Sequence, residues 1–376
     1  MKILYILFEE LSQSNGVSKK VLAQCDGFKA NGAEVSLYSL KSCEGELLAV
    51  VNDAPIHSYG KSFLKYLRLL LEFNHISKYI KDNNIDVVYT RFSRTSPLMI
   101  YLFRAIKKLK VKSLLEIPTY PYDTEKSYGG AFRIKLYYSI LFKIDAITRN
   151  FIKYYIDRII TVQDYDQILG IPTVKISNAI NLNKIPLRSS NPHNGIVFVG
   201  VAILAEWHAF DRLIEGIGRY YKMGGIEDIH FYIVGKNTSV KEKYIGISKA
   251  YNIESRIHLE GPKEGVELDS YFDCSDLAIG SLGFHRIGLT EGKPLKCIEY
   301  AARGIPFIYS NINMDFDDKA YTMKMPADDS PIDIENLLVF LKNQTDNPST
   351  IRDSIGVKAT WDYQMSLVLN ELNSIQ

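Results

Sequence analysis

The chain has 376 residues, of which 46% are hydrophobic and 23% are charged. This composition excludes a disordered or collagen-like protein, and the length predicts two or three domains that each bury a core. No apolar run approaches the roughly 20 residues of a membrane-spanning helix, and the four scattered cysteines indicate neither a disulfide framework nor a zinc site, which favours a reducing cytoplasm.

The two halves of the chain carry opposite charge. Residues 1–190 contain 27 Lys and Arg against 17 Asp and Glu, whereas residues 191–376 contain 18 against 26. A basic half favours an anionic partner. Because no segment resembles a nucleic-acid-binding module, we expect a phosphate-bearing substrate or a phospholipid surface and no nucleic acid.

The first half alternates short apolar runs with helical segments. Its N-terminus, MKILYILFEE, reaches Glu9 and Glu10 before the core of a signal peptide could finish, and we interpret it as a strand. Strands are predicted at residues 2–8, 34–40, 86–90, 113–117 and 158–162. This alternation is typical of βα units that build a parallel sheet.

Two helical stretches of this half, residues 61–81 and 132–155, mix Lys and Arg with Leu, Ile, Phe and Tyr. Such a composition suits an interface with an anionic membrane. It also suits helices that pack on a core and leave a basic edge in solvent. Both interpretations stay open at the level of sequence.

The βα pattern restarts after SNPHNG (residues 190–195), with the strands GIVFVG, IHFYIVG, RIHLEG, DLAIG and IPFIYS. We therefore predict an α/β protein of two Rossmann-like, doubly wound domains, residues 1–188 and 189–358, that face a central cleft. Apolar residues at helical spacing in TWDYQMSLVLNELNSI predict a C-terminal helix at about 359–376 that packs back onto the first domain.

The segment LAIGSLGFHRIGLTEGKPLKCIEYAARGIPFIYS combines a strand, a polar loop and a short helix. Pro294 suits the first helical position and Gly304 a left-handed C-cap, which predicts a helix over residues 294–303. The backbone NH groups at its start form an anion site, to which Lys293 and Lys296 add charge. A diphosphate would fit there.

Glu291 and Glu299, with seven residues between them, resemble the E-x7-E motif of retaining glycosyltransferases of family 4, which have the GT-B fold. The similarity extends to Asn15-Gly16, EWHAFDRLIEG (206–216), YIVG, HLEGP and SNAIN, and so to most of the chain. The stretch EGKPLKCIEYAARGIPFI is most similar to bacterial enzymes that build capsular or other surface polysaccharides.

The resemblance implies roles for individual residues. Glu291 would contact hydroxyls of the donor sugar, and Glu299 would accept hydrogen bonds from the nucleotide ribose. Gly16 would let the backbone approach the diphosphate, and Leu295 lies in the helix turn that would bind it. No metal or other cofactor is implied, and we reject the triplets Asp315-Phe316-Asp317 and Asp164-Tyr165-Asp166 as metal sites.

The sequence departs from the family where an Arg and a Lys usually neutralise the diphosphate. It has no Arg after Gly200, and His208 stands roughly where the Lys would fall. Either Arg286, Lys293 or Lys296 supplies the charge, or catalysis is impaired. We interpret Arg286 and Lys296 as the replacement, whereas His208 either contacts the diphosphate or caps a helix.

The first domain also departs, because EIPTYPYDTE (116–125) replaces the usual histidine motif of the cleft. For the acceptor side we select Arg91, Tyr120 and Asp123. The resemblance implies transfer of a sugar from a nucleotide diphosphate sugar, by preference a UDP-sugar, to a glycan or undecaprenyl-pyrophosphate-linked acceptor at the cytoplasmic face of the membrane. A catalytically silent GT-B protein that partners an active transferase is the alternative.

Overall fold

The computed structural model describes residues 1–12, 16–61, 65, 68–69, 72–92, 95–121, 143–236 and 240–374. The chain divides into two compact units, unit 1 (Met1–Ser177 with Thr360–Gln376) and unit 2 (Asn178–Ala359). The division after Ser177 precedes the one expected after residue 188. The reason is that Ile180 packs in the core of unit 2 and the Arg188 NH donates to the carbonyl of Arg303 at 2.9 Å.

Unit 1 contains a nine-stranded sheet in the order β4-β3-β2-β1-β5-β6-β7-β9-β8. The strands β1, β2, β5, β6, β7 and β9 run parallel to one another. The strands are β1 (Lys2–Glu10), β2 (Glu34–Cys43), β3 (Glu46–Val51), β4 (Ala54–Ser58), β5 (Val87–Arg91), β6 (Lys112–Glu116), β7 (Arg158–Thr161), β8 (Gln167–Ile168) and β9 (Ile171–Lys175).

The antiparallel edge formed by β3 and β4 was not among the predicted strands. Two short turns produce it, at Glu44-Gly45 and at Asn52-Asp53, and all four residues have positive φ. Turns with this backbone match the twist of paired strands and form tight hairpins. The first domain therefore extends its parallel sheet with a meander.

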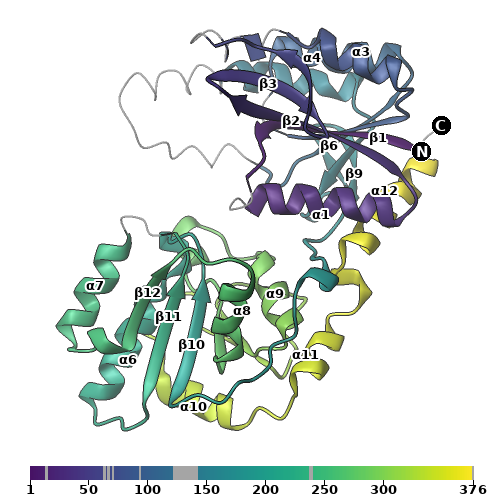
Figure 1. Cartoon of the computed structure of the whole chain (residues 1–376). Helices are drawn as coiled ribbons and strands as arrows, with labels where there is room; N and C mark the ends of the chain where they lie inside the picture. The colour runs from purple at the N-terminus through teal and green to yellow at the C-terminus, as the bar shows by residue number, and fades with distance from the viewer. Residues whose placement is uncertain are drawn as a thin grey trace. The chain divides into compact units, whose positions relative to one another are not determined.

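Helices cover both faces of this sheet (Figure 1), with α3 and α4 on one face and α1 and α12 on the other. The helices are α1 (Gly16–Ala30), α3 (Asn74–Asp82), α4 (Pro97–Lys108), the 3-10 helix η2 (Arg149–Tyr154) and α12 (Trp361–Ser374). A Cβ at Gly27 would meet the Trp361 carbonyl oxygen at 2.6 Å. Glycine at this position lets α12 lie directly on α1.

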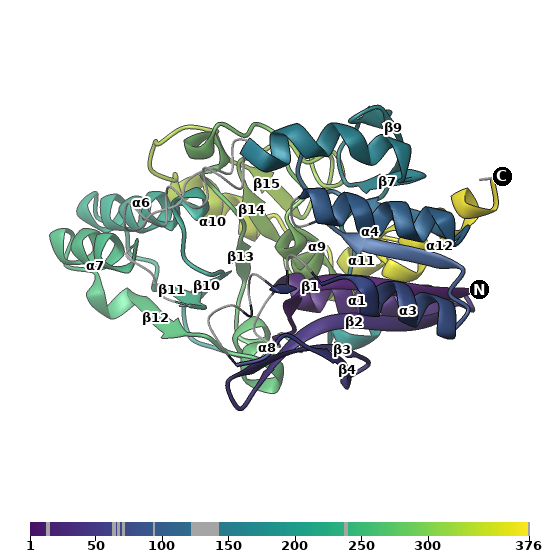
Figure 2. The same cartoon turned by 90° about the horizontal axis from the view of Figure 1, so that it is seen from above.

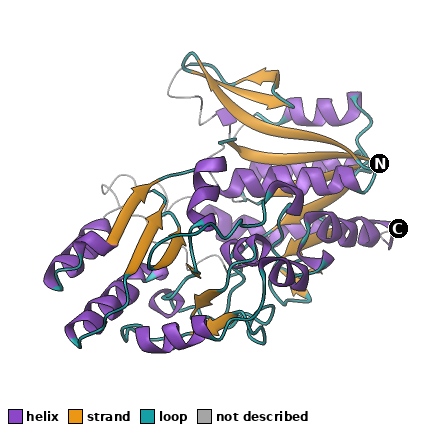
Figure 3. Cartoon of the chain, turned by 60° about the horizontal axis from the view of Figure 1, so that its bottom comes forward, coloured by secondary structure: helices purple, strands orange, loops and turns teal. Residues whose placement is uncertain are grey.

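Unit 2 contains a six-stranded parallel sheet in the order β12-β11-β10-β13-β14-β15. Figures 2 and 3 show it from two further directions. The strands are β10 (Ile196–Val201), β11 (Ile229–Val234), β12 (Ile257–Gly261), β13 (Leu277–Ile279), β14 (Phe307–Tyr309) and β15 (Thr322–Lys324).

Two apolar cores fill the space on the two faces of this sheet, one under α6, α7 and α10 and the other under α8, α9 and α11. The helices are α6 (Phe210–Lys222), α7 (Val240–Ala250), α8 (Gly265–Asp273), α9 (Leu295–Arg303), α10 (Ile334–Lys342) and α11 (Pro348–Ser354). Short 3-10 helices are η3 (Leu182–Lys184), η4 (Glu206–His208), η5 (Glu254–Arg256), η6 (Phe284–Ile287) and η7 (Val357–Ala359).

The two units thus have Rossmann-like parallel cores, which confirms the predicted doubly wound α/β class. In unit 2 the strand order reverses at β10, which pairs with β11 on one side and β13 on the other. Ligands in open parallel sheets bind outside the carboxyl ends of the strands at such a reversal. We therefore expect a ligand-binding site at the loops that follow β10 and β13.

Candidate functional site

The loops after β10 and β13 are fastened to each other in unit 2. The NH groups of Leu282 and Gly283 donate to the carbonyls of His208 and Trp207, both at 3.1 Å. A Cβ at Gly283 would lie 2.6 Å from the Cβ of Ala209, so this close approach requires glycine. The contact sets η4 beside the loop that leads to α9.

His208 and Lys296 form a pair at this junction. The Nζ of Lys296 lies 3.0 Å from Nδ1 of His208, and the Ser281 hydroxyl lies 3.2 Å from the same nitrogen. An ammonium group can only donate, so Nδ1 accepts and the imidazole is neutral. Burial, together with the Lys296 charge, lowers the pKa of His208 to about 2.

Burial also lowers the pKa of Lys296, to about 8. The side chain lies over the ring of Phe210, with Nζ 5.7 Å from the ring centroid, a cation–π contact. A lysine with this pKa carries its charge at neutral pH, and here the side chain is half-buried. Its attraction for an anion is correspondingly strong.

Lys296 is also the second residue of α9, which begins at Leu295, one residue later than predicted. Pro294 is the N-cap, with extended backbone (φ −61°, ψ 134°), and Gly304 ends the helix in the left-handed region (φ 73°) as expected. The NH groups of a first helical turn have no intrahelical partner and attract anions. Backbone and side chain of Lys296 therefore act at the same end of one helix.

The other two predicted cations are paired with carboxylates. The Nζ of Lys293 lies 3.0 Å from Oδ1 of Asp315. Arg286 donates through both Nη atoms to Asp211, each at 2.8 Å, and through Nε to Asp329 at 2.7 Å. Arg286 was expected to be available for the diphosphate. Instead it is paired with carboxylates and fixes η6 to the start of α6.

The Arg286–Asp211 pair is reflected in the pKa values of both groups. The hydrogen bonds that Arg286 donates to Asp211 and Asp329 raise its pKa. Burial opposes ionisation of Asp211, but Arg286 and the ammonium of Lys243, 2.9 Å away, lower its pKa. A carboxylate held between two cations stays ionised, which makes this clamp on the loop after β13 stable at neutral pH.

The two glutamates of the predicted motif lie on different elements and have different surroundings. Glu291 is exposed, and its backbone forms an isolated parallel bridge with Ile312. Glu299 lies in the second turn of α9, where its Oε1 accepts from Nε and Nη2 of Arg303 at 3.2 and 3.1 Å. Both hydrogen bonds go to the same oxygen of Glu299, and the side chain is 34% exposed.

The loop after β14 adds polar groups that sequence reasoning missed. Nδ2 of Asn311 donates to the Gly292 carbonyl at 2.6 Å. Its Oδ1 and Nδ2 of Asn313 are buried and have no hydrogen-bond partner among the described residues. The run NIN (311–313) directly after the predicted strand IPFIYS was the available signal, because its two asparagines follow the end of a strand.

The residues predicted in the first half lie in unit 1. Gly16 begins α1, and a Cβ there would meet no atom within 4 Å, so the space beside it is open. Tyr120 exchanges two hydrogen bonds between its backbone and the side chain of Gln163. Asp123 and Asn15 lie outside the described residues.

Arg91 ends β5 and donates through Nη1 to Oε1 of Glu116 at 2.9 Å. Lys20 reaches the same oxygen at 3.0 Å, and the Tyr89 hydroxyl donates to Oε2 at 2.9 Å. Burial opposes ionisation of Glu116, but the two cations lower its pKa to about 2. The burial of the Glu116 carboxylate at the end of β6 was not predicted. A Glu that follows Ser-Leu-Leu in the sequence is expected to be an exposed residue at the end of a strand.

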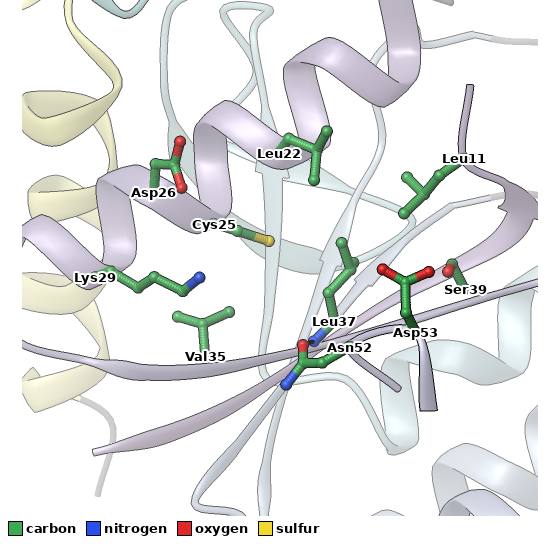
Figure 4. Close-up of a pocket in the computed structure, with 10 residues that line it drawn as sticks. All are labelled: Leu11, Leu22, Cys25, Asp26, Lys29, Val35, Leu37, Ser39, Asn52 and Asp53. Atoms are coloured by element: carbon green, nitrogen blue, oxygen red, sulfur yellow. Dashed lines mark hydrogen bonds between the residues drawn. The ribbon is translucent and has the colours of Figure 1, made fainter. Parts of the chain in front are cut away.

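A pocket of about 180 Å³ also lies in unit 1, between α1, β2 and the turn that joins β3 to β4 (Figure 4). It is lined by Leu11, Leu22, Cys25, Asp26, Lys29, Val35, Leu37, Ser39, Asn52 and Asp53. None of the predicted site residues lines it.

Within the described ranges, no group of three or more His, Cys, Asp or Glu residues is arranged to hold a metal ion. No helix in the part of the chain that the structure describes has the length and apolar character needed to cross a bilayer.

The match of a family model falls on the unit that holds the His208–Lys296 pair. Residues 193–336 match the family described as Glycosyl transferases group 1. None of the curated proteins matches the sequence.

Solved structures match over the whole chain. A glycosyltransferase from Rickettsia africae ESF-5 is 15% identical over 100% of this chain and 97% of that chain, with a TM-score of 0.65. A sucrose-phosphate synthase from Thermosynechococcus elongatus is 13% identical over 100% of both chains, with a TM-score of 0.69. HepE from Anabaena, in complex with UDP and glucose, is 12% identical over 100% of both chains, with a TM-score of 0.60.

These neighbours are GT-B glycosyltransferases, and at such low identity the similarity establishes the fold. The chain therefore has the GT-B fold, and its residues 193–336 are similar to the family described as Glycosyl transferases group 1.

Proposed function

We propose that the protein is a retaining glycosyltransferase of family 4 that moves a sugar from a nucleotide diphosphate sugar, by preference a UDP-sugar, to an acceptor hydroxyl. The observation that carries the proposal is the His208–Lys296 pair. It puts a half-buried ammonium group at the N-terminus of α9, next to the point where the strand order of unit 2 reverses. The neighbour HepE, whose structures contain UDP with glucose and UDP-glucose, supports a UDP-sugar.

In this proposal the main task of the protein is to stabilise negative charge on the leaving diphosphate. Lys296 supplies a cation, and the NH groups of Leu295 and Lys296 supply hydrogen bonds to the same anion. His208 holds the ammonium group in place through Nδ1 and adds no charge of its own, because it is neutral. The bond between the sugar and the diphosphate breaks, the acceptor oxygen bonds to the sugar on the same face, and the leaving phosphate takes the proton of the acceptor hydroxyl.

The remaining assignments follow the resemblance to family 4. Glu299 binds the ribose through the oxygen that Arg303 leaves unused, and Glu291 contacts the transferred sugar. The reaction needs no metal ion, since the cation and the helix start carry the charge. The acceptor is a glycan or an undecaprenyl-pyrophosphate-linked glycan of a bacterial surface polysaccharide, reached from the cytoplasmic side, with Arg91 and Tyr120 on the acceptor side.

One observation favours a second candidate, a catalytically silent GT-B protein that partners an active transferase. Two of the three predicted cations, Arg286 and Lys293, are paired with carboxylates, so of these three Lys296 alone has a neutral partner. A diphosphate carries more than one negative charge. With one cation that has a neutral partner, such a site could bind the nucleotide but would not stabilise the charge of the leaving diphosphate.

Calorimetric titration with UDP and uridine, followed by donor hydrolysis over a panel of nucleotide sugars, tests both candidates. An active enzyme binds UDP more tightly than uridine and hydrolyses at least one donor, and Lys296→Ala lowers UDP affinity and hydrolysis together. The matched control is Lys249→Ala, which removes an exposed lysine from the end of α7 in the same unit. UDP binding with no turnover of any donor supports the silent candidate, and absence of UDP binding rejects both.

A further inference from the structure

One surface of unit 1 carries apolar side chains that point away from the core. It is formed by α4 and by the helical residues 143–154, which end in η2 and lie side by side with α4 (Figure 2). Nζ of Lys107 on α4 donates to the Tyr154 carbonyl at 2.9 Å, which ties the two segments together.

The segment 143–154 has apolar residues on both of its sides. Thr148 and Ile152 are buried, as expected for the side that faces the sheet. Ile147, Phe151 and Tyr154 follow at i, i+4 and i+7 on the other side and are 68%, 52% and 56% exposed. Tyr101 of α4 adds a further side chain that is 58% exposed. A stripe of this kind at helical spacing is a surface that water covers poorly.

The same two segments and the turn after α4 also carry exposed cations. They are Arg104, Lys107, Lys108, Lys110, Lys143 and Lys153. Nζ of Lys153 lies 5.3 Å from the ring centroid of Tyr154. We name the four apolar residues and these six cations the basic–apolar patch.

The patch has almost no negative charge. In residues 97–112 and 143–155 the sequence contains one acidic residue, Asp145. Asp145 is 1% exposed, and its Oδ1 accepts from the NH and the hydroxyl of Thr95 at 2.7 and 2.6 Å. Its charge is thus directed into unit 1 and does not offset the cations on the surface.

We infer that the basic–apolar patch docks unit 1 on the surface of an anionic lipid bilayer. Ile147 and Phe151 would enter the boundary between headgroups and acyl chains, while the cations would remain at the headgroups and contact lipid phosphates. Each cation near such a surface strengthens binding by about fivefold. The inference does not depend on the proposed function, because binding to lipid requires neither nucleotide nor sugar.

Two other occupants fit the patch less well. A second copy of the chain would bring six like charges against six, which opposes a symmetric contact. A nucleic acid would contact the cations, but the exposed aliphatic side chain of Ile147 gives it no favourable contact. An anionic bilayer uses both the charge and the apolar side chains.

Flotation of the full chain with vesicles tests the inference. We expect binding to vesicles of phosphatidylcholine mixed with phosphatidylglycerol, weak binding to phosphatidylcholine alone, and release by high salt. The double variant Ile147→Ser/Phe151→Ser should weaken binding at least about tenfold, and Arg104→Glu/Lys108→Glu should do so as well. Thermal melting of each variant identifies any that fail to fold.

Matched controls come from exposed residues of unit 2. Ile226→Ser/Val266→Ser changes two apolar side chains that are 89% and 84% exposed, and Lys249→Glu reverses an exposed charge. These variants should bind vesicles like the unaltered protein, and all variants should keep the same UDP affinity. The inference is overturned if the unaltered protein does not bind the anionic vesicles, or if the controls lose as much binding as the patch variants. It is also overturned if the patch variants abolish only dimer formation or binding to an oligonucleotide.

Discussion

Nζ of Lys296 lies 3.0 Å from Nδ1 of His208, although the two residues are 88 positions apart in the chain. The neutral imidazole accepts from the ammonium group, so the pair presents one positive charge. Because burial lowers the pKa of Lys296 to about 8, this charge is lost at a mildly alkaline pH.

We predict that UDP affinity falls as the pH rises through about 8. Above the pKa of Lys296 the free protein must take up a proton to bind the diphosphate, which costs about tenfold in affinity per pH unit. Titration calorimetry at several pH values measures this slope, and uridine serves as the comparison because it lacks the phosphates. Lys296→Ala should bind UDP weakly and without this slope; an unchanged slope would show that another group carries the charge.

The same shift predicts the stability of the protein without ligand. Between about 8 and the ordinary lysine value of 10.5, Lys296 is protonated in the unfolded chain and neutral in the folded one. The free energy of unfolding contributed by this group therefore rises with pH across that window. Urea unfolding should show the rise in the unaltered protein relative to Lys296→Met, and a fall would contradict the lowered pKa.

Arg286→Ala and Asp211→Ala should weaken UDP binding by a similar factor. Arg286 acts on the site by holding η6 to α6, and either substitution breaks that clamp. Asp211→Ala distinguishes this role from direct contact with the diphosphate, because it would release the guanidinium to bind phosphate. Unchanged or higher UDP affinity in Asp211→Ala would assign Arg286 to the diphosphate itself.

Glu299→Ala and Glu291→Ala should affect different steps. Loss of a charge-assisted hydrogen bond to the ribose costs about 1.5–3 kcal/mol, so Glu299→Ala should lower UDP affinity tenfold or more. Glu291→Ala should keep UDP affinity and lose turnover, since it contacts only the transferred sugar. Small and equal effects of both variants on binding and turnover would reject the two assignments.

Glu116→Gln should lower the free energy of unfolding by about 3–5 kcal/mol, because it leaves Lys20 and Arg91 buried next to a neutral side chain. Urea unfolding measures the change. The control is Glu34→Gln, whose carboxylate is 71% exposed and lies 3.8 Å from Lys2; its effect should stay within about 1 kcal/mol. A loss in Glu116→Gln no larger than in the control would mean that the cations are solvated.

The sequence by itself determined the features that depend on neighbouring residues. Short apolar runs bounded by turn residues predicted β1, β2, β5, β6 and β7 of unit 1 and β10 to β14 of unit 2. The parallel strands β9 and β15 were not predicted. Pro294 and Gly304 predicted the start and end of α9 to within one residue, because caps act through the backbone of the same turn. The boundary between the units was harder to predict from the sequence, because it depends on which core Ile180 packs into.

Tertiary structure decided which charges are available at the site. Arg286, Lys293 and Lys296 are equivalent cations in the sequence, and their partners come from segments outside their own helix or loop. Arg286 is paired with Asp211, 75 positions away, and Lys293 is paired with Asp315. Of the three cations, only Lys296 has a neutral partner, His208. Likewise Glu116 becomes a buried carboxylate only because β5, β6 and α1 meet around it. A side chain's charge and burial depend on neighbours that the folded chain brings within about 4 Å, and the order of residues along the chain does not specify them.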